Sequence, residues 1–92
     1  MLTSDFRKSL ASKAHSLSPI VRIGQKGLTD NVHKEIDQSL LAHELIKIKV
    51  IGSNAEERKL MVDSMIDKHH ASLIQMIGHV AVLYRHNPDK KT

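Results

Sequence analysis

The feature that most constrains the fold is a pair of glycines placed directly after a short apolar run. The run is Ile20-Val21-Arg22-Ile23, and Gly24-Gln25-Lys26-Gly27 follows it at once. Leu28-Thr29-Asp30-Asn31 then has the polar residues of a helix start. We therefore expect a strand that turns sharply into a helix. The two glycines let backbone amides approach an anion closely, with the positive end of the helix dipole behind them.

The remainder of the first half alternates between helix and strand patterns. Residues 4–17 carry apolar side chains at three- and four-residue spacing, which predicts an amphipathic helix capped by Ser4 and ended by Ser18-Pro19. Residues 28–42 repeat apolar side chains every four residues and predict a second helix. Residues 44–51 alternate instead, so they predict a strand whose polar face carries Lys47 and Lys49.

The second half continues the alternation. Two overlapping capping boxes, Ser53 to Glu56 and Asn54 to Glu57, predict a third helix that closes near residue 70. Two β-rich runs, 73–77 and 80–84, flank Gly78-His79, which is the signal for a two-residue hairpin. The predicted fold is α/β (α+β), one compact domain over residues 1–86 in the order αβαβαββ. Right-handed crossovers place the second and third helices on one face of a mixed four-stranded sheet.

The pattern does not place the first helix, and we expect residues 87–92 to form a disordered tail. The chain has 92 residues and no cysteine, so one hydrophobic core must hold it without disulfides. No apolar stretch is long enough to span a bilayer and the start lacks the pattern of a signal peptide, so we expect a cytoplasmic protein with no membrane partner.

The charge balance favours a polyanionic partner. The chain has a formal net charge of +4 and a pI near 9.6. Its only aromatic residues are Phe6 and Tyr84, so recognition should depend on backbone and shape more than on base stacking. The KH module clamps an RNA backbone with a Gly-x-x-Gly loop of this form. The candidate RNA-binding residues are Arg7, Lys8, Arg22, Gly24, Gln25, Lys26, Gly27, Lys47 and Lys49.

Each of these residues also has an ordinary structural explanation. The glycines could simply make a tight turn, and single cations, including Lys13, Lys34 and Arg85, could be solvated surface charges. Lys47 and Lys49 could protect an edge strand from aggregation. Seven histidines lack the spacing of a metal site, no nucleophile elbow is visible, and the glycine loop lacks the Lys-Ser or Lys-Thr of a P-loop. We therefore expect neither catalysis nor a cofactor.

The glycine loop and its flanks resemble the CRM domain, named for chloroplast RNA splicing and ribosome maturation. The matching positions are Leu17, Pro19, Val21, Ile23, Gly24, Gly27, Leu28 and Thr29. Residues 44–50 resemble the family's second strand, and residues 77–85 resemble its closing hairpin. The length of the chain is similar to that of the bacterial stand-alone, YhbY-type members.

The resemblance implies a fold similar to the carboxy-terminal domain of translation initiation factor three. It also implies binding to ribosomal RNA in precursors of the large subunit, with Gly24, Gln25, Lys26 and Gly27 as the RNA contact, and Arg22 and Lys47 beside it. We expect a monomer. Two other classes stay open: an adaptor that docks on ribosomal or regulatory proteins through the sheet face or the first helix, and a small enzyme acting on RNA, for which no acid–base pair is found.

Overall fold

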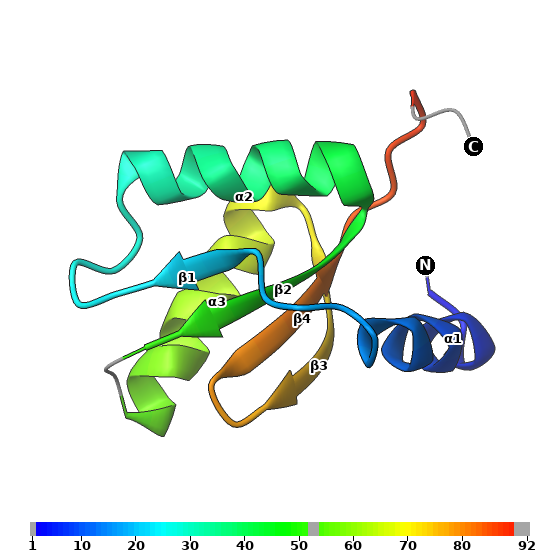
Figure 1. Ribbon diagram of the computed structural model, residues 1–92, viewed down its shortest axis with the longest axis horizontal. Helices are drawn as coiled ribbons and strands as arrows, with labels where there is room; N and C mark the ends of the chain where they lie inside the picture. Colours follow the sequence, from blue (N-terminus) through cyan, green and yellow to red (C-terminus); the bar gives the residue numbers. More distant parts are fainter. Residues whose placement is uncertain (1, 52–53, 90–92) are drawn as a thin grey trace.

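Seven elements follow one another in the predicted order (Figure 1). The computed structural model describes residues 2–51 and 54–89, so the predicted Ser53 cap lies outside the described residues. The elements are α1 (Ser4–Ala14), β1 (Val21–Ile23), α2 (Asp30–His43), β2 (Leu45–Val50), α3 (Ala55–His69), β3 (Ser72–Ile77) and β4 (Val80–Tyr84). None of the helices in the described ranges is long and apolar enough to cross a membrane.

The four strands form the mixed sheet that the sequence predicts. Their order is β1-β2-β4-β3. β1 runs parallel to β2, whereas β4 pairs antiparallel with both β2 and β3. The hairpin turn lies at Gly78-His79 as predicted, and Gly78 has a φ of +56°, which a residue with a Cβ adopts only under strain.

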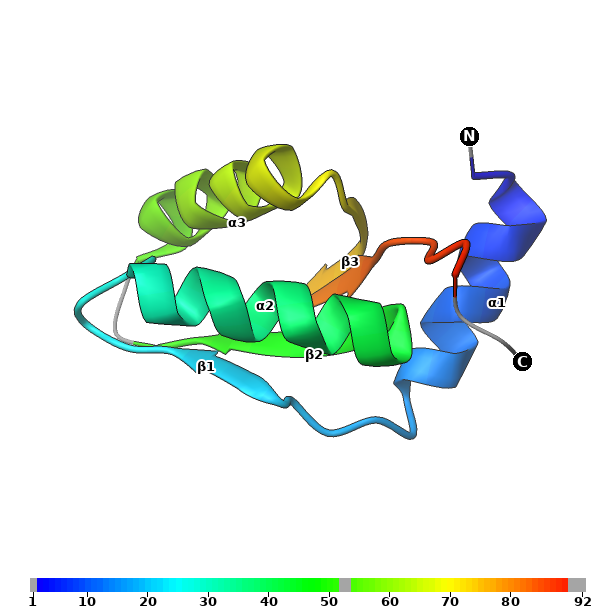
Figure 2. The ribbon, with the colours of Figure 1, turned by 90° about the horizontal axis from the view of Figure 1, so that it is seen from above.

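The main core lies between the sheet and the two longer helices. Alternate residues of β2, Ile46, Ile48 and Val50, are at most 1% exposed, and they pack with Ile36 from α2 and Met65 from α3. The residues between them on β2 therefore face the other side of the sheet. Figure 2 shows α2 and α3 together on one side, with α1 apart from them at the end of the sheet.

α1, which the sequence could not place, forms a second and smaller core. Leu10 and Ala14 pack with Ile74 of β3 and Val82 of β4. Val82 is flanked on its strand by Ala81 and Leu83, which belong to the main core. Because successive strand residues point to opposite faces, α1 covers the face that α2 and α3 leave open.

Two predicted details of α1 are wrong. The cap is Thr3 rather than Ser4, since Thr3 Oγ1 accepts a hydrogen bond from the Phe6 N–H at 3.1 Å. The helix ends at Ala14 rather than at residue 17, well before Ser18-Pro19. The chain turns there because the Ser16 hydroxyl and the Leu17 N–H bond to the carbonyls of Lys13 and Ala14, at 3.0 Å each.

The other two helix starts agree with the sequence. Thr29 Oγ1 accepts from the Val32 N–H at 3.2 Å, which confirms Thr29 as the cap of α2. Asn54 Oδ1 accepts from the Glu57 N–H at 2.8 Å, which confirms Asn54 as the cap of α3, and the Glu57 carboxylate accepts from the Asn54 side-chain amide at 3.2 Å.

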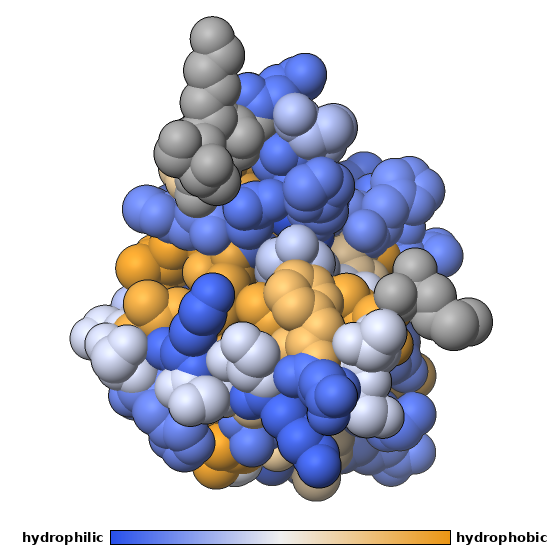
Figure 3. All heavy atoms as spheres, turned by 90° about the vertical axis from the view of Figure 1, so that its right-hand side faces the viewer, coloured by the Kyte–Doolittle hydropathy of each residue, from blue (hydrophilic) through white to orange (hydrophobic). Residues whose placement is uncertain are grey.

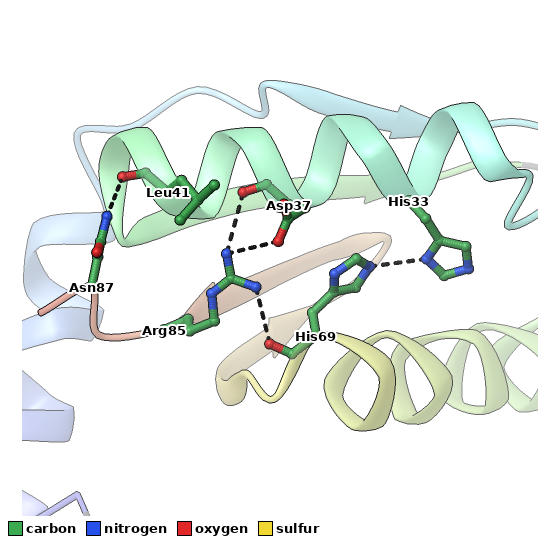
Figure 4. Close-up of polar contacts among 6 residues, drawn as sticks. All are labelled: His33, Asp37, Leu41, His69, Arg85 and Asn87. Carbon is green, nitrogen blue, oxygen red and sulfur yellow. Dashed lines mark hydrogen bonds and ion pairs between the residues drawn. The ribbon is translucent and has the colours of Figure 1, made fainter. Parts of the chain in front are cut away.

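A polar joint connects the ends of α2, α3 and β4 (Figure 4). The Arg85 side chain, 19% exposed, pairs with Asp37 Oδ1 at 3.0 Å through Nη2. The same guanidinium donates to the carbonyls of His69 and Asp37, at 3.1 and 3.3 Å. Arg85 therefore holds two helix backbones together and is not a free surface cation.

The joint continues through Asn87, the first residue of the predicted tail. The Asn87 side chain donates to the Leu41 carbonyl at 2.9 Å, and its backbone N–H donates to Glu44 Oε2 at 2.8 Å. These two hydrogen bonds connect Asn87 to the end of α2 and to Glu44, the residue that follows it. Residues 90–92 of the predicted tail lie outside the described residues.

Two histidine rings lie beside this joint. His33 Nδ1 is 2.9 Å from His69 Nε2, so one ring donates to the other. Burial lowers the pKa of His69 below its ordinary value of 6.5, and the charges of His33 and Arg85 lower it further against the opposite effect of Asp37. His69 is therefore harder to protonate in the folded protein than in the unfolded chain.

We predict that stability falls as the solution is acidified from about pH 7.5 to about pH 5.5. The pKa of His69 is lower in the folded state, so below its ordinary value of 6.5 the unfolded chain binds more protons and becomes relatively more stable. Thermal unfolding midpoints across this range measure the effect. His69→Gln should flatten the dependence, whereas His43→Gln, a change at an exposed residue of α2, should retain it. Equal slopes in the two variants would contradict the assignment.

Candidate nucleic-acid interface

The glycine turn lies at the exposed corner where β1 passes into α2 (Figure 1). The Gly27 N–H donates to the Gly24 carbonyl at 3.0 Å and closes the turn. Gln25 and Lys26 are exposed, and a Cβ added at Gly24 or Gly27 would meet no atom within 4 Å. Space is therefore open on the side of each glycine where a side chain would project.

Gly27 sets the direction in which the chain enters α2. Its φ of +71° lies in the left-handed region, which glycine adopts without steric cost. The Thr29 N–H then donates to the Gly27 carbonyl at 3.1 Å, and Thr29 caps the helix. The positive end of the α2 dipole consequently faces the turn, although Asp30 places one carboxylate in the first turn of the helix.

Three predicted cations lie together on the sheet face opposite α2 and α3. Arg22 of β1 is the register partner of Lys49 of β2, and Lys47 follows two residues earlier on β2. Arg22 is exposed, and both lysines are half-buried. Since Gly24 is two residues beyond Arg22, the three cations continue directly from the glycine turn. We call the turn 24–27 with Arg22, Lys47 and Lys49 the basic corner.

The two predicted cations of α1 do not belong to this group. α1 lies at the opposite end of the molecule from the turn (Figure 1). Arg7 donates through Nη1 to the carbonyl of Leu73 on β3 and so helps to hold α1 on the sheet. Figure 3 looks at this end and shows apolar side chains gathered between polar ones; α1 contributes Phe6, which is 39% exposed. Arg7 and Lys8 are therefore separate from the basic corner.

The two aromatic residues are also remote from the turn. Phe6 of α1 and Tyr84 of β4 make an edge-to-face contact with ring centroids 5.5 Å apart. The chain has no further Phe, Tyr or Trp. A base held near the turn consequently has no Phe, Tyr or Trp ring to stack on.

Sequence reasoning missed a groove next to the glycine turn. The groove has a volume of about 340 Å³ and is lined by Gly24, Gln25, Gly27, Ile51, Glu57, Leu60 and Met61. Leu60 lies outside the apolar stripe of α3 and is 65% exposed. In the sequence, the one indication of the groove was that Leu60 is an apolar residue at a polar position of the predicted helix. Only the fold shows that Leu60 lies beside the turn.

Residues 2–51 and 54–89 contain no cluster of side chains that could bind a metal ion. There, no three histidine, aspartate or glutamate side chains converge closely enough to hold an ion. The rings of His33 and His69 lie close together, but they are hydrogen-bonded to each other. Among the described residues, the basic corner is therefore the main group of candidate binding residues.

Comparison with known proteins gives a family match over nearly the whole chain. The model of the CRS1/YhbY (CRM) domain matches residues 2–85. A Haemophilus influenzae protein named "RNA-binding protein" is 39% identical over 90 residues, which cover 98% of this chain and 91% of the relative. A Bacillus subtilis protein named "Probable RNA-binding protein YqeI" is 36% identical over 91 residues, which cover 99% and 95%.

A solved structure supports the same architecture. A Staphylococcus aureus protein whose structure was determined in solution is similar to this chain with a TM-score of 0.83 at 35% sequence identity. The match covers 99% of this chain and 95% of that protein. The order of elements, the mixed sheet and the corner between β1 and α2 are thus those of a known fold.

We predict that the two glycines of the turn respond differently to alanine. Gly27→Ala should cost about 1 kcal/mol of stability, because an L-residue is strained at a φ of +71° although space for the Cβ is open. At Gly24 the φ is not positive and an added Cβ would meet no atom, so Gly24→Ala should change the free energy of unfolding by no more than about 0.5 kcal/mol. Urea unfolding of both variants measures the difference. Equal losses would show that the backbone of Gly27 is not the constraint.

Proposed function

The chain belongs to the CRS1/YhbY (CRM) domain family, and from this premise we propose that it is a non-enzymatic RNA-binding protein whose basic corner holds the phosphate backbone. The observation that carries the proposal is the open glycine turn, with a left-handed Gly27 at its end and Lys26 inside it. Relatives over nearly the full length carry names that describe RNA binding.

The geometry supports backbone contact in two ways. The glycines lack side chains, so a phosphate can approach the amides of the turn, where the α2 dipole favours negative charge. Beyond the turn, Arg22 and Lys49 are side by side on adjacent strands. A strand of RNA that leaves the turn across this sheet face meets one cation after another, which positions the chain without reading its sequence.

We further propose that the RNA is ribosomal and that the protein acts in assembly of the large subunit as a cytoplasmic monomer. This finer proposal rests on the resemblance to the bacterial stand-alone members of the family. Crosslinking in cells followed by sequencing of the bound RNA tests it. Enrichment of large-subunit precursors is expected, and enrichment of unrelated transcripts would contradict it.

An adaptor function has one observation in its favour. The α1 end of the molecule exposes apolar side chains, among them Phe6 at 39%, and Figure 3 shows them gathered on that end. Pull-down after nuclease treatment separates the two functions. Partners that persist without RNA would favour the adaptor, whereas their loss supports RNA binding.

We predict a strong salt dependence of binding to single-stranded RNA. If the basic corner neutralises about four phosphates, log affinity should fall against log salt with a slope near −3. Lys26→Ala should weaken binding to all sequences alike and reduce the slope by about 0.7. Lys13→Ala, an exposed lysine on α1 at the other end, serves as the matched control. Fluorescence anisotropy titrations give both quantities, and an affinity independent of salt would exclude the mechanism.

A further inference from the structure

We infer that the groove beside the glycine turn receives one unstacked base of the RNA whose phosphate the turn holds. The inference rests on the proposed function and extends it from backbone contact to base contact. We call this groove the base groove; its residues come from the turn, from Ile51 directly after β2 and from the first half of α3.

The position of the groove argues for a nucleotide. Gly24, Gln25 and Gly27 form both the anion-holding turn and one wall of the groove. A ligand that fits both must carry a negative group joined to an apolar body, and a nucleotide has this composition. The groove volume of about 340 Å³ lies at the lower end of the range for small-ligand sites.

The apolar surface of the groove is unusually exposed. Leu60 is 65% exposed and Ile51 is 41% exposed, while Met61 packs partly against the main core. A single exposed leucine needs no explanation, but here two large aliphatic side chains line one groove. They offer a surface to the flat face of a base, in place of the aromatic rings that this chain keeps at its α1 end.

Glu57 favours entry of the base, rather than the phosphate, into the groove. Glu57 lines the groove, and its negative charge would repel a phosphate there, which favours the phosphate on the Lys26 side of the turn. A carboxylate does accept hydrogen bonds from the amino group of a base. Asn54 Nδ2 donates to Glu57 Oε1 at 3.2 Å, and no described residue donates to the other oxygen. The groove should therefore prefer bases with an exocyclic amino group over uracil.

The other grooves lack this combination. The groove between α3 and β3, of about 350 Å³, is lined by Val62, Leu73 and Met76 together with Arg58, Lys59 and Asp63, but by no residue of the glycine turn. The groove beside Leu17 and Ile20, of about 300 Å³, includes Lys47 of the basic corner but no residue of the glycine turn. Of these three grooves, the base groove is thus the one that shares residues with the glycine turn.

The test compares three probes of equal length in fluorescence anisotropy: oligocytidylate, oligouridylate and a ribose-phosphate chain without bases. Wild-type protein should bind oligocytidylate about fivefold more tightly than the abasic chain, because the base covers about half of an exposed leucine. Leu60→Ser should lose this preference and keep the wild-type salt slope. Leu41→Ser, at a leucine on α2 that is 48% exposed, should retain the preference.

Glu57→Gln tests the preference for an amino group. Glutamine adds a donor and removes the charge, so the affinities for oligocytidylate and oligouridylate should become equal within about twofold. An unchanged ratio would overturn the role of Glu57. Thermal unfolding of each variant confirms that it is folded.

The two proposals fail in distinguishable ways. Failure of the proposed function appears as binding that is absent or independent of salt for all three probes. Failure of the base groove appears as salt-dependent binding in which oligocytidylate and the abasic chain are equal, or in which Leu60→Ser behaves like wild type.

Discussion

The parallel pairing of β1 with β2 is the interaction on which the rest of the structure depends. β1 has only three residues, yet Val21 and Ile23 are at most 1% exposed. The Ile51 N–H donates to the Ile23 carbonyl at 2.8 Å and extends the pairing to the end of both strands. Because burial fixes the register, Arg22 must lie beside Lys49, and the glycine turn must leave the sheet at its exposed corner.

The sheet separates charge from hydrophobic burial. On β2, residues 46, 48 and 50 enter the main core, and the residues between them carry the basic side chains of the opposite face. α1 covers only one end of that face, where Leu10 and Ala14 pack on β3 and β4. The uncovered remainder is next to the turn. The same strand thus stabilises the fold with one set of side chains and presents cations with the other.

Several polar residues of the types that form binding sites instead hold the fold together. Arg85 bonds to the carbonyls of His69 and Asp37, and Arg7 bonds to that of Leu73. These guanidiniums satisfy backbone acceptors where helices meet the sheet, which a solvated cation would not do. Arg22, Lys47 and Lys49 of the basic corner form no such joint with α2 or α3, because their strands direct them away from both helices.

The sequence by itself determined the element order, the two helix caps at Thr29 and Asn54, and the glycine turn, because these depend on neighbours within a few residues. It predicted the cation group only in part: alternation places Lys47 and Lys49 on one face, but the strand pairing brings Arg22 to them. The tertiary structure alone decided the place of α1, the separation of Arg7 and Lys8 from the turn, and the groove at Leu60. Periodicity shows which face of an element is apolar, whereas the partner of that face is chosen by packing between residues distant in the chain.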